Sequence, residues 1–236
     1  MNNSHLYLFL LCSERSGSNL LTQIFNAHSQ ICAPSPSHLL RLLLSNYNNY
    51  GNLQKEANWN TLLNDVSDYL NSKLGHWESS ISYDDLKNNT TQNNITSIID
   101  YTYLKEAEVN YKSTFFIKEN KVYDYFNELE TRFPKQKFIY LIRDPRAYYA
   151  SYKHSQNHPL DLEGAINLWK TDQTEYIKLT EHTNSSTIRY EDLVSDPNYY
   201  LKKLFKELDL PFEEEVLHFY KNSNTIENAA TISNWK

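Results

Sequence analysis

The segment that most constrains the fold is a short polar loop directly after an apolar run. The run covers Leu6 to Cys12, and the residues that follow it are Ser13-Glu14-Arg15-Ser16-Gly17-Ser18-Asn19-Leu20-Leu21, which open an amphipathic stretch reaching Ala27. This order predicts a strand, a tight loop and a helix. Because glycine lets the backbone approach a ligand and a helix N-terminus presents free N–H groups, the loop predicts a phosphate site.

The loop does not follow the Walker pattern of nucleotide triphosphatases. That pattern needs a longer glycine-bounded loop that ends in Gly-Lys and a serine or threonine. Here Gly17 is the single glycine and the lysine is missing, while Arg15, Ser16 and Asn19 add side-chain donors. A phosphate cradle of another kind is therefore expected, and the alternative is an ordinary strand-to-helix turn with a capping serine.

Two later segments carry a family resemblance. An apolar, β-rich strand at Lys137–Ile142 runs into Arg143-Asp144-Pro145-Arg146, and the next helix carries Ser151. Further on stands Arg189-Tyr190-Glu191-Asp192-Leu193. In this order, and together with the N-terminal loop, these motifs resemble the sulfotransferases that use 3′-phosphoadenosine 5′-phosphosulfate (PAPS). The resemblance covers residues 6–33 and 137–212 and is weak between them.

Strands that alternate with helices predict a parallel sheet covered on both faces, with right-handed crossovers. The fold class expected is α/β, three-layered, with a central parallel sheet flanked by helices, which the resemblance specifies as the P-loop-like sulfotransferase architecture. A single domain over residues 1–236, with a helical insertion at about 45–112, is the expected organisation. The predicted strands are Leu6–Cys12, Thr114–Lys118, Lys137–Ile142 and Thr187–Tyr190. The predicted helices are Gly17–Ala27, Ser37–Leu44, Trp59–Leu74, Ile95–Tyr111, Val122–Arg132, Pro145–Ser155, Asp161–Glu181 and Asn198–Leu208, with polar turns at Asn48–Gly51 and Lys87–Thr90.

Three polar clusters are expected to meet at one edge of this sheet. They are Ser13–Asn19, Lys118–Asn120 and Arg143–Arg146, and each follows a predicted strand. Ligands of open parallel sheets bind beyond the carboxyl ends of the strands. The convergence predicts a site independently of the resemblance.

The resemblance implies which residues bind the co-substrate. Arg143 and Ser151 would bind the 3′-phosphate, since a guanidinium fork and a hydroxyl suit a dianion. Tyr190 would lie near the adenine, although a tyrosine at the end of a buried strand is as often part of the core. The loop residues expected to hold the 5′-phosphosulfate are Arg15, Ser16, Gly17, Ser18, Asn19 and Leu20.

Sulfuryl transfer resembles phosphoryl transfer in needing in-line geometry and stabilised negative charge. Lys118 ends its strand where the family commonly places a lysine near the transferred group, so Lys118 and Arg15 would offset that charge, and no metal is implied. The alternative for Lys118 is a solvated residue at a strand end.

A hydroxyl acceptor also needs a general base. The cytosolic branch of the family has a histidine where this chain has Asn120, and the tyrosylprotein branch has a glutamate near the position of Pro36. His38 is the first candidate, since the unperturbed imidazole titrates near neutrality, and Glu119 is the next. The alternative for His38 is a capping or surface residue.

The expected function is transfer of a sulfuryl group from PAPS to a hydroxyl, or less favourably an amine, of a small-molecule or carrier-bound acceptor. Trp59 and Trp77 could stack on the acceptor, and core packing is the favoured alternative. Two other classes stay open: a P-loop-type small-molecule kinase, and a non-catalytic descendant that binds a nucleotide or phosphorylated ligand. The final Ser233-Asn234-Trp235 is similar to a late Ser-x-Trp element of the family, whereas the Arg-Lys-Gly element of the cytosolic branch is missing.

Composition excludes several partners. The formal net charge of −6 and a pI near 5.8 argue against a nucleic acid or an anionic membrane as partner. The run Leu6 to Cys12 is too short for a membrane span and lacks a basic flank, so a cytoplasmic protein is expected. Cys12 and Cys32 are too few for a disulfide framework or a metal site.

Overall fold

The structure is a computed structural model that describes residues 6–72, 77–133, 135–154 and 160–228. Its described part contains a five-stranded sheet in the order β2-β3-β1-β4-β5. The four pairs of neighbouring strands all run parallel. The strands are β1 (Tyr7–Leu11), β2 (Ile31–Cys32), β3 (Thr114–Lys118), β4 (Lys137–Ile142) and β5 (Ser185–Arg189).

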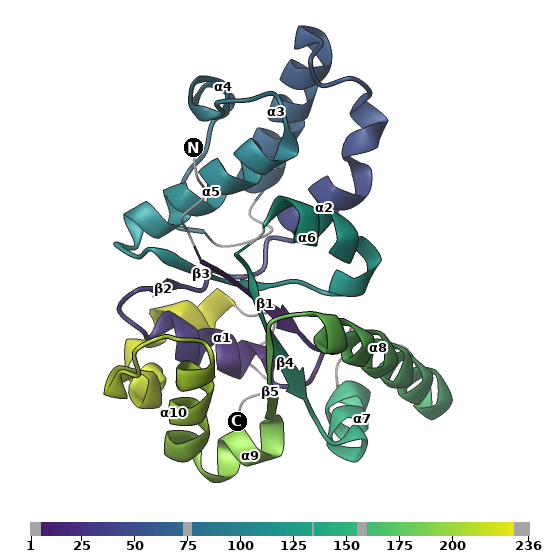
Figure 1. The fold of residues 1–236 in the computed structure, drawn as a ribbon, viewed down its shortest axis with the longest axis vertical. Coiled ribbons are helices and arrows are strands. Elements are labelled where there is room, and N and C mark those ends of the chain that lie inside the picture. Colours follow the sequence, from purple (N-terminus) through teal and green to yellow (C-terminus); the bar gives the residue numbers. More distant parts are fainter. Residues whose placement is uncertain (1–5, 73–76, 134, 155–159, 229–236) are drawn as a thin grey trace.

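Helices connect these strands, as Figure 1 shows. The α-helices are α1 (Ser18–Asn26), α2 (Leu39–Asn46), α3 (Glu56–Asn71), α4 (Tyr83–Asn89), α5 (Ile95–Val109), α6 (Phe126–Arg132), α7 (Pro145–Lys153), α8 (Leu162–His182), α9 (Tyr190–Ser195) and α10 (Pro197–Glu207). The 3₁₀ helices are η1 (Tyr47–Tyr50), η2 (Val122–Tyr125) and η3 (Glu214–Asn228).

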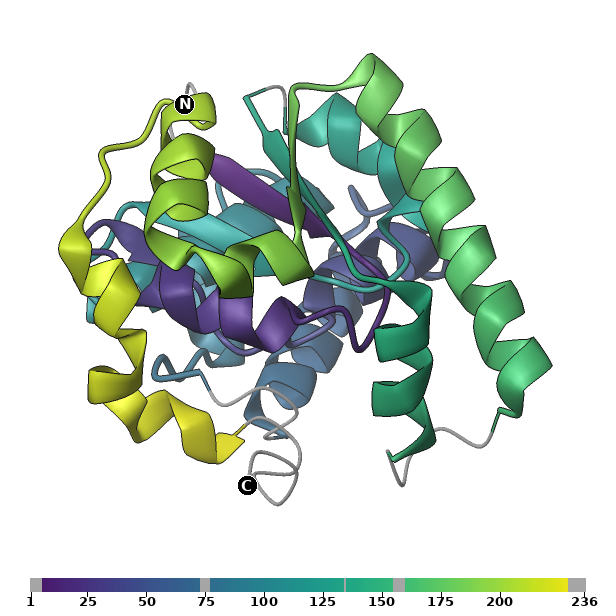
Figure 2. The same ribbon diagram turned by 90° about the horizontal axis from the view of Figure 1, so that it is seen from below.

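Side chains of the central strand β1 divide between two cores. Phe9 and Leu11 pack into the core formed with α2, α3, α5 and α6. Leu8 and Leu10 pack into the opposite core, with α1 and α10. This alternation follows from the two-residue period of a strand. The predicted three-layer α/β architecture is confirmed, and Figures 1 and 2 show the two helical layers on either side of the strands.

Several predicted boundaries are wrong for identifiable reasons. Tyr190 does not end the last strand but starts α9, whose first turn carries the acidic pair Glu191 and Asp192, favourable at a helix N-terminus. The predicted turn Lys87–Thr90 lies largely within α4, because a capping box of Ser82 and Asp85 begins a helix there.

Smaller differences concern local geometry. The strand β2 was not predicted, because two residues are too short for a visible alternation. The predicted helix Val122–Arg132 divides into η2 and α6, and the predicted turn Asn48–Gly51 is mostly the 3₁₀ helix η1. The C-terminal Ser233–Trp235 lies outside the described residues.

The carboxyl ends of three strands meet at one edge. Leu10 of β1 pairs with Lys118 of β3, and Leu11 of β1 pairs with Tyr140 of β4. The chain leaves β1 toward α1 on one face, and β3 leads through α6 to β4 on the other side of β1. A strand order that reverses in this way places a ligand crevice beside the central strand. None of the described helices is long and apolar enough to cross a membrane.

Candidate active site

The loop between β1 and α1 has two residues with positive φ. Arg15 has φ 65° and Gly17 has φ 94°, the latter just before the first residue of α1. A Cβ at Gly17 would lie 2.2 Å from Cδ2 of Tyr190. Glycine is therefore required at this position for two reasons. The backbone has a positive φ, and any side chain would collide with the ring of Tyr190.

Hydrogen-bond donors without a protein partner lie in this loop and beside it. No side chain caps the N-terminus of α1, so its first N–H groups remain available to a ligand. Within the described structure, Ser16 Oγ and Arg143 Nε are buried and have no hydrogen-bond partner. Because buried polar groups are normally paired, these orphan donors are consistent with an anionic ligand such as a phosphosulfate.

Arg143 connects the end of β4 to this loop. Its Nη1 donates a hydrogen bond to the carbonyl oxygen of Arg15 at 2.8 Å, and its guanidinium lies 4.4 Å from the ring centroid of Tyr190. Arg15 Nε in turn donates to Ser151 Oγ of α7 at 3.2 Å. The structure thus brings together four of the residues predicted to bind the co-substrate, across the β1–β4 crevice.

Lys118 lies at the end of β3 and points to the same loop. Its ammonium donates a hydrogen bond to Asn19 Oδ1 of α1. Burial lowers the pKa of Lys118, although the charges of Glu14 and Glu119 oppose that effect. The side chain is therefore not the solvated strand-end lysine of the alternative reading.

His38 and Glu119, predicted as alternative bases, form one pair. His38 precedes α2 with φ 58°, and its Nδ1 lies 3.1 Å from Glu119 Oε2. Glu119 is 1% exposed and His38 34% exposed at the side chain. With an ionised Glu119, Nδ1 would donate this hydrogen bond, which would leave Nε2 as the basic nitrogen. The second carboxylate oxygen, Glu119 Oε1, is buried without a partner in the described structure.

Other predicted residues have mainly structural contacts. Ser18 begins α1 and is buried, and its carbonyl accepts a hydrogen bond from Thr22. Leu20 packs against the core on the α1 face. Trp59 is buried in the core, and Trp77 packs on Tyr103 and donates to a backbone carbonyl, so core packing accounts for both tryptophans.

Several residues that support the site were not predicted from the sequence motifs. Gln173 of α8 donates to Ser13 Oγ at 2.8 Å and accepts from the hydroxyl of Tyr140, which fixes the start of the loop. The three-residue spacing from Gln173 to the buried Tyr176 predicts that both side chains lie on one face of α8. It does not predict which residue the Gln173 amide contacts.

Two further contacts hold the ends of the loops. Glu191 accepts a hydrogen bond from the backbone N–H of Asp144 at 3.0 Å. It belongs to the Arg-Tyr-Glu-Asp-Leu motif identified in the sequence. Asn120 donates to Glu14 Oε1 at 2.5 Å and so connects the end of β3 to the loop between β1 and α1. No cluster of potential metal ligands occurs among the described residues.

The sequence matches the model of the sulfotransferase family over residues 8–214. The chain belongs to the sulfotransferase family. This match spans the phosphate loop, Lys118, Arg143 and Tyr190, so the predicted family is confirmed. No curated protein matches the chain.

Solved sulfotransferase structures share this fold. The sulfotransferase domain from the Synechococcus PCC 7002 olefin synthase has a TM-score of 0.66 and 22% identity, over 93% of this chain and 78% of that one. The sulfotransferase domain from the curacin biosynthetic pathway gives 0.60 and 22%, over 90% and 77%. Mouse sulfotransferase SULT7A1, complexed with PAP, gives 0.51 and 12%, over 99% and 69%. These likenesses confirm the architecture of this sulfotransferase.

Proposed function

We propose that this sulfotransferase moves the sulfuryl group of PAPS to a hydroxyl group of an acceptor. The observation that carries the proposal is the pair of buried, unpartnered donors, Ser16 Oγ and Arg143 Nε, beside an uncapped helix N-terminus. A buried donor without a partner costs free energy, and an anionic ligand would remove that cost. A fold relative, SULT7A1, was solved with PAP, the product that PAPS leaves behind.

The donor set fits the two phosphate groups of the nucleotide. The backbone of Ser16–Asn19 and the side chain of Arg15 would hold the 5′ group, with Lys118 next to the transferred sulfuryl. Arg143 and Ser151 would hold the 3′-phosphate, and Tyr190 would border the adenine. PAPS supplies an activated sulfuryl group with PAP as the leaving group, so the chain needs to position reactants and stabilise charge.

In this proposal His38 would act as the general base. Nε2 would take the proton of the acceptor hydroxyl while the hydrogen bond from Nδ1 to Glu119 holds the tautomer. The buried carboxylate would also stabilise the imidazolium that forms. Glu119 is in this scheme a positioning residue, and Lys118, next to it in sequence, would stabilise the sulfuryl oxygens.

Calorimetric binding of PAP, with ATP and AMP as comparators and Arg143→Ala as the variant, tests the nucleotide assignment. Tight binding of PAP that the variant loses is the expected result. Selective binding of ATP would favour a kinase instead, and absence of any nucleotide binding would refute the proposal.

Turnover then separates an enzyme from a binding descendant. Incubation with PAPS and a panel of alcohols, phenols and amines should release PAP with hydroxyl acceptors, and His38→Ala should lower the rate by about 10²- to 10⁴-fold. A protein that binds PAP tightly but transfers no sulfuryl group to any acceptor would be the non-catalytic descendant.

A further inference from the structure

A groove lies between α2, η1 and α3, and its lining begins at Leu39, the residue after His38. Its volume is about 390 Å³, within the range of small-molecule sites. Its apolar lining includes Leu39, Leu42 and Leu43 of α2 and Leu62 and Val66 of α3. Asp65 is the one charged residue among the described residues that line the groove, and it accepts a hydrogen bond from the Tyr50 hydroxyl.

Tyr69 joins this groove to the catalytic pair. Its ring lines the groove, and its hydroxyl donates to the backbone carbonyl of Ser37 at 2.5 Å, directly before His38. Burial, with the nearby charge of Glu119, raises the pKa of Tyr69. Leu39, which follows His38, lines the same end. The apolar groove therefore starts one residue from the proposed base.

The lining of the groove follows α2. Its lining runs from Leu39 to Asn46, a rise of roughly 10 Å at 1.5 Å per helical residue. An unbranched alkyl chain laid along α2 would contact apolar side chains over this length. Leu42 is 37% exposed and contributes apolar surface to the groove.

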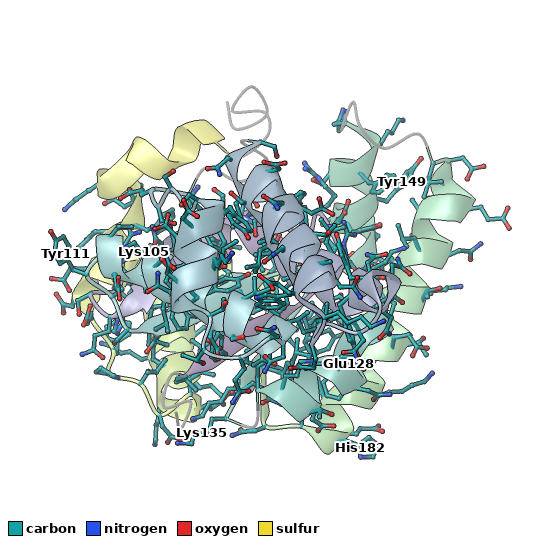
Figure 3. The ribbon with its side chains drawn as sticks, turned by 90° about the horizontal axis from the view of Figure 1, so that it is seen from above. Lys105, Tyr111, Glu128, Lys135, Tyr149 and His182 are labelled. Carbon is teal, nitrogen blue, oxygen red and sulfur yellow. The ribbon has the colours of Figure 1, made fainter. Side chains whose placement is uncertain are left out.

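At its far end the groove borders η1, which contacts α6. Tyr47 lies against the guanidinium of Arg132 on α6, 5.2 Å from its ring centroid, and its hydroxyl reaches Glu128 at 3.5 Å. Arg132 and Glu128, the latter labelled in Figure 3, pair with each other at 2.9 Å. These contacts connect η1 to α6 at the end of the groove away from His38.

We propose that the groove binds the unbranched aliphatic tail of the hydroxyl acceptor and so makes the enzyme selective for long-chain alcohols. The inference rests on the proposed function, since it assumes that the acceptor hydroxyl reaches His38 Nε2. The tail would bury apolar surface against α2 and α3 while the hydroxyl end lies beside Tyr69 and His38. Each added methylene would improve binding by up to about fourfold, the equivalent of about 0.8 kcal/mol.

Calorimetry with 1-butanol and 1-octanol on PAP-saturated protein tests this proposal. The expected result is that 1-octanol binds at least about tenfold more tightly than 1-butanol. Leu42→Glu should abolish this preference, since it places a carboxylate in the groove. Leu42→Ser, which replaces the isobutyl group by a small polar one without adding a charge, should weaken the preference and guards against a variant that does not fold.

Leu162→Glu is the matched control, because Leu162 is 54% exposed on α8 and does not line the groove. It should retain the wild-type preference. Equal affinity for the two alcohols, or a preference that Leu42→Glu leaves intact, would overturn the groove as the tail site. PAP binding is measured first on each protein: its absence from wild type would instead refute the proposed function, and with it the groove's role as an acceptor site.

Discussion

Glu119 and His38 come from different segments, 81 residues apart in sequence, yet the Glu119 carboxylate lies 3.1 Å from Nδ1 of His38. Glu119 follows directly after β3, and His38 stands before α2 with a left-handed backbone. A left-handed conformation is uncommon outside glycine and concentrates at functional sites. The contact places the His38 imidazole beside the residue that follows Lys118.

Glu119→Gln is expected to lower kcat by about ten- to a hundredfold and to leave the affinity for PAP unchanged. Glutamine keeps an oxygen acceptor for Nδ1 but loses the charge that stabilises the imidazolium. Glu119→Ala removes both, so its loss should be larger. Steady-state kinetics with PAPS and the best acceptor measure kcat and KM separately.

Combining Glu119→Ala with His38→Ala tests whether Glu119 acts through His38. If Glu119 acts through His38, then Glu119→Ala should cause little further loss in a His38→Ala background, since residues that act as a unit are not additive. Independent, multiplicative losses would instead show that Glu119 acts on its own. Circular dichroism of each variant controls for misfolding.

Gly17→Ala should abolish PAP binding and destabilise the protein by about 1–3 kcal/mol. The new methyl group would meet the Tyr190 ring at 2.2 Å, and φ 94° is strained for alanine. Chemical denaturation and calorimetry measure the two effects. Adding Tyr190→Ala removes the collision but not the backbone strain, so the double variant should recover part of the stability. Full PAP affinity in Gly17→Ala alone would contradict the proposed role of the loop.

The sequence was sufficient for the layers and for the edge where the site lies. The strands β1, β3 and β4 are apolar runs followed by polar residues, and a parallel sheet brings those ends to one edge. The strand Thr114–Lys118 has the predicted bounds. Boundaries governed by single side-chain contacts were less predictable: the Ser82–Asp85 box that starts α4 outweighs the asparagines that suggested a turn.

Residue pairing within the site was harder to predict. His38 and Glu119 were separate candidates, because nothing in a sequence states that two distant segments place their side chains in contact. The hydrogen bond from Gln173 to Ser13 depends on how α8 packs on the sheet, so no local sequence pattern predicts it. Tyr190 shows the same limit, since its packing on Gly17 requires the three-dimensional arrangement of β5 and α1.

Arg143→Lys should lower PAP affinity by about ten- to a hundredfold even though the charge is kept. The guanidinium both donates to the Arg15 carbonyl and lies over the Tyr190 ring, and its Nε remains available to a ligand. An ammonium group is a point donor and cannot make these contacts together. Calorimetry with PAP measures the loss, and Arg146→Lys is the control, since the Arg146 side chain is 90% exposed. If Arg143→Lys and wild type bound PAP with equal affinity, the guanidinium group of Arg143 would not be needed for PAP binding.

Lys118→Met should separate activity from stability. Loss of the cation beside the transferred group is expected to lower kcat by about 10²- to 10³-fold. The same change should stabilise the ligand-free protein at pH 7, because burial lowers the pKa of Lys118 in the folded state. The folded state then holds the proton less tightly than the unfolded chain, so the protonated lysine costs stability at neutral pH. That cost disappears as pH rises through the unfolded pKa near 10.4. Urea denaturation of both proteins at pH 7 and near pH 10 should therefore show a gain for Lys118→Met that shrinks at the higher pH, and a gain that grows instead would contradict the burial argument.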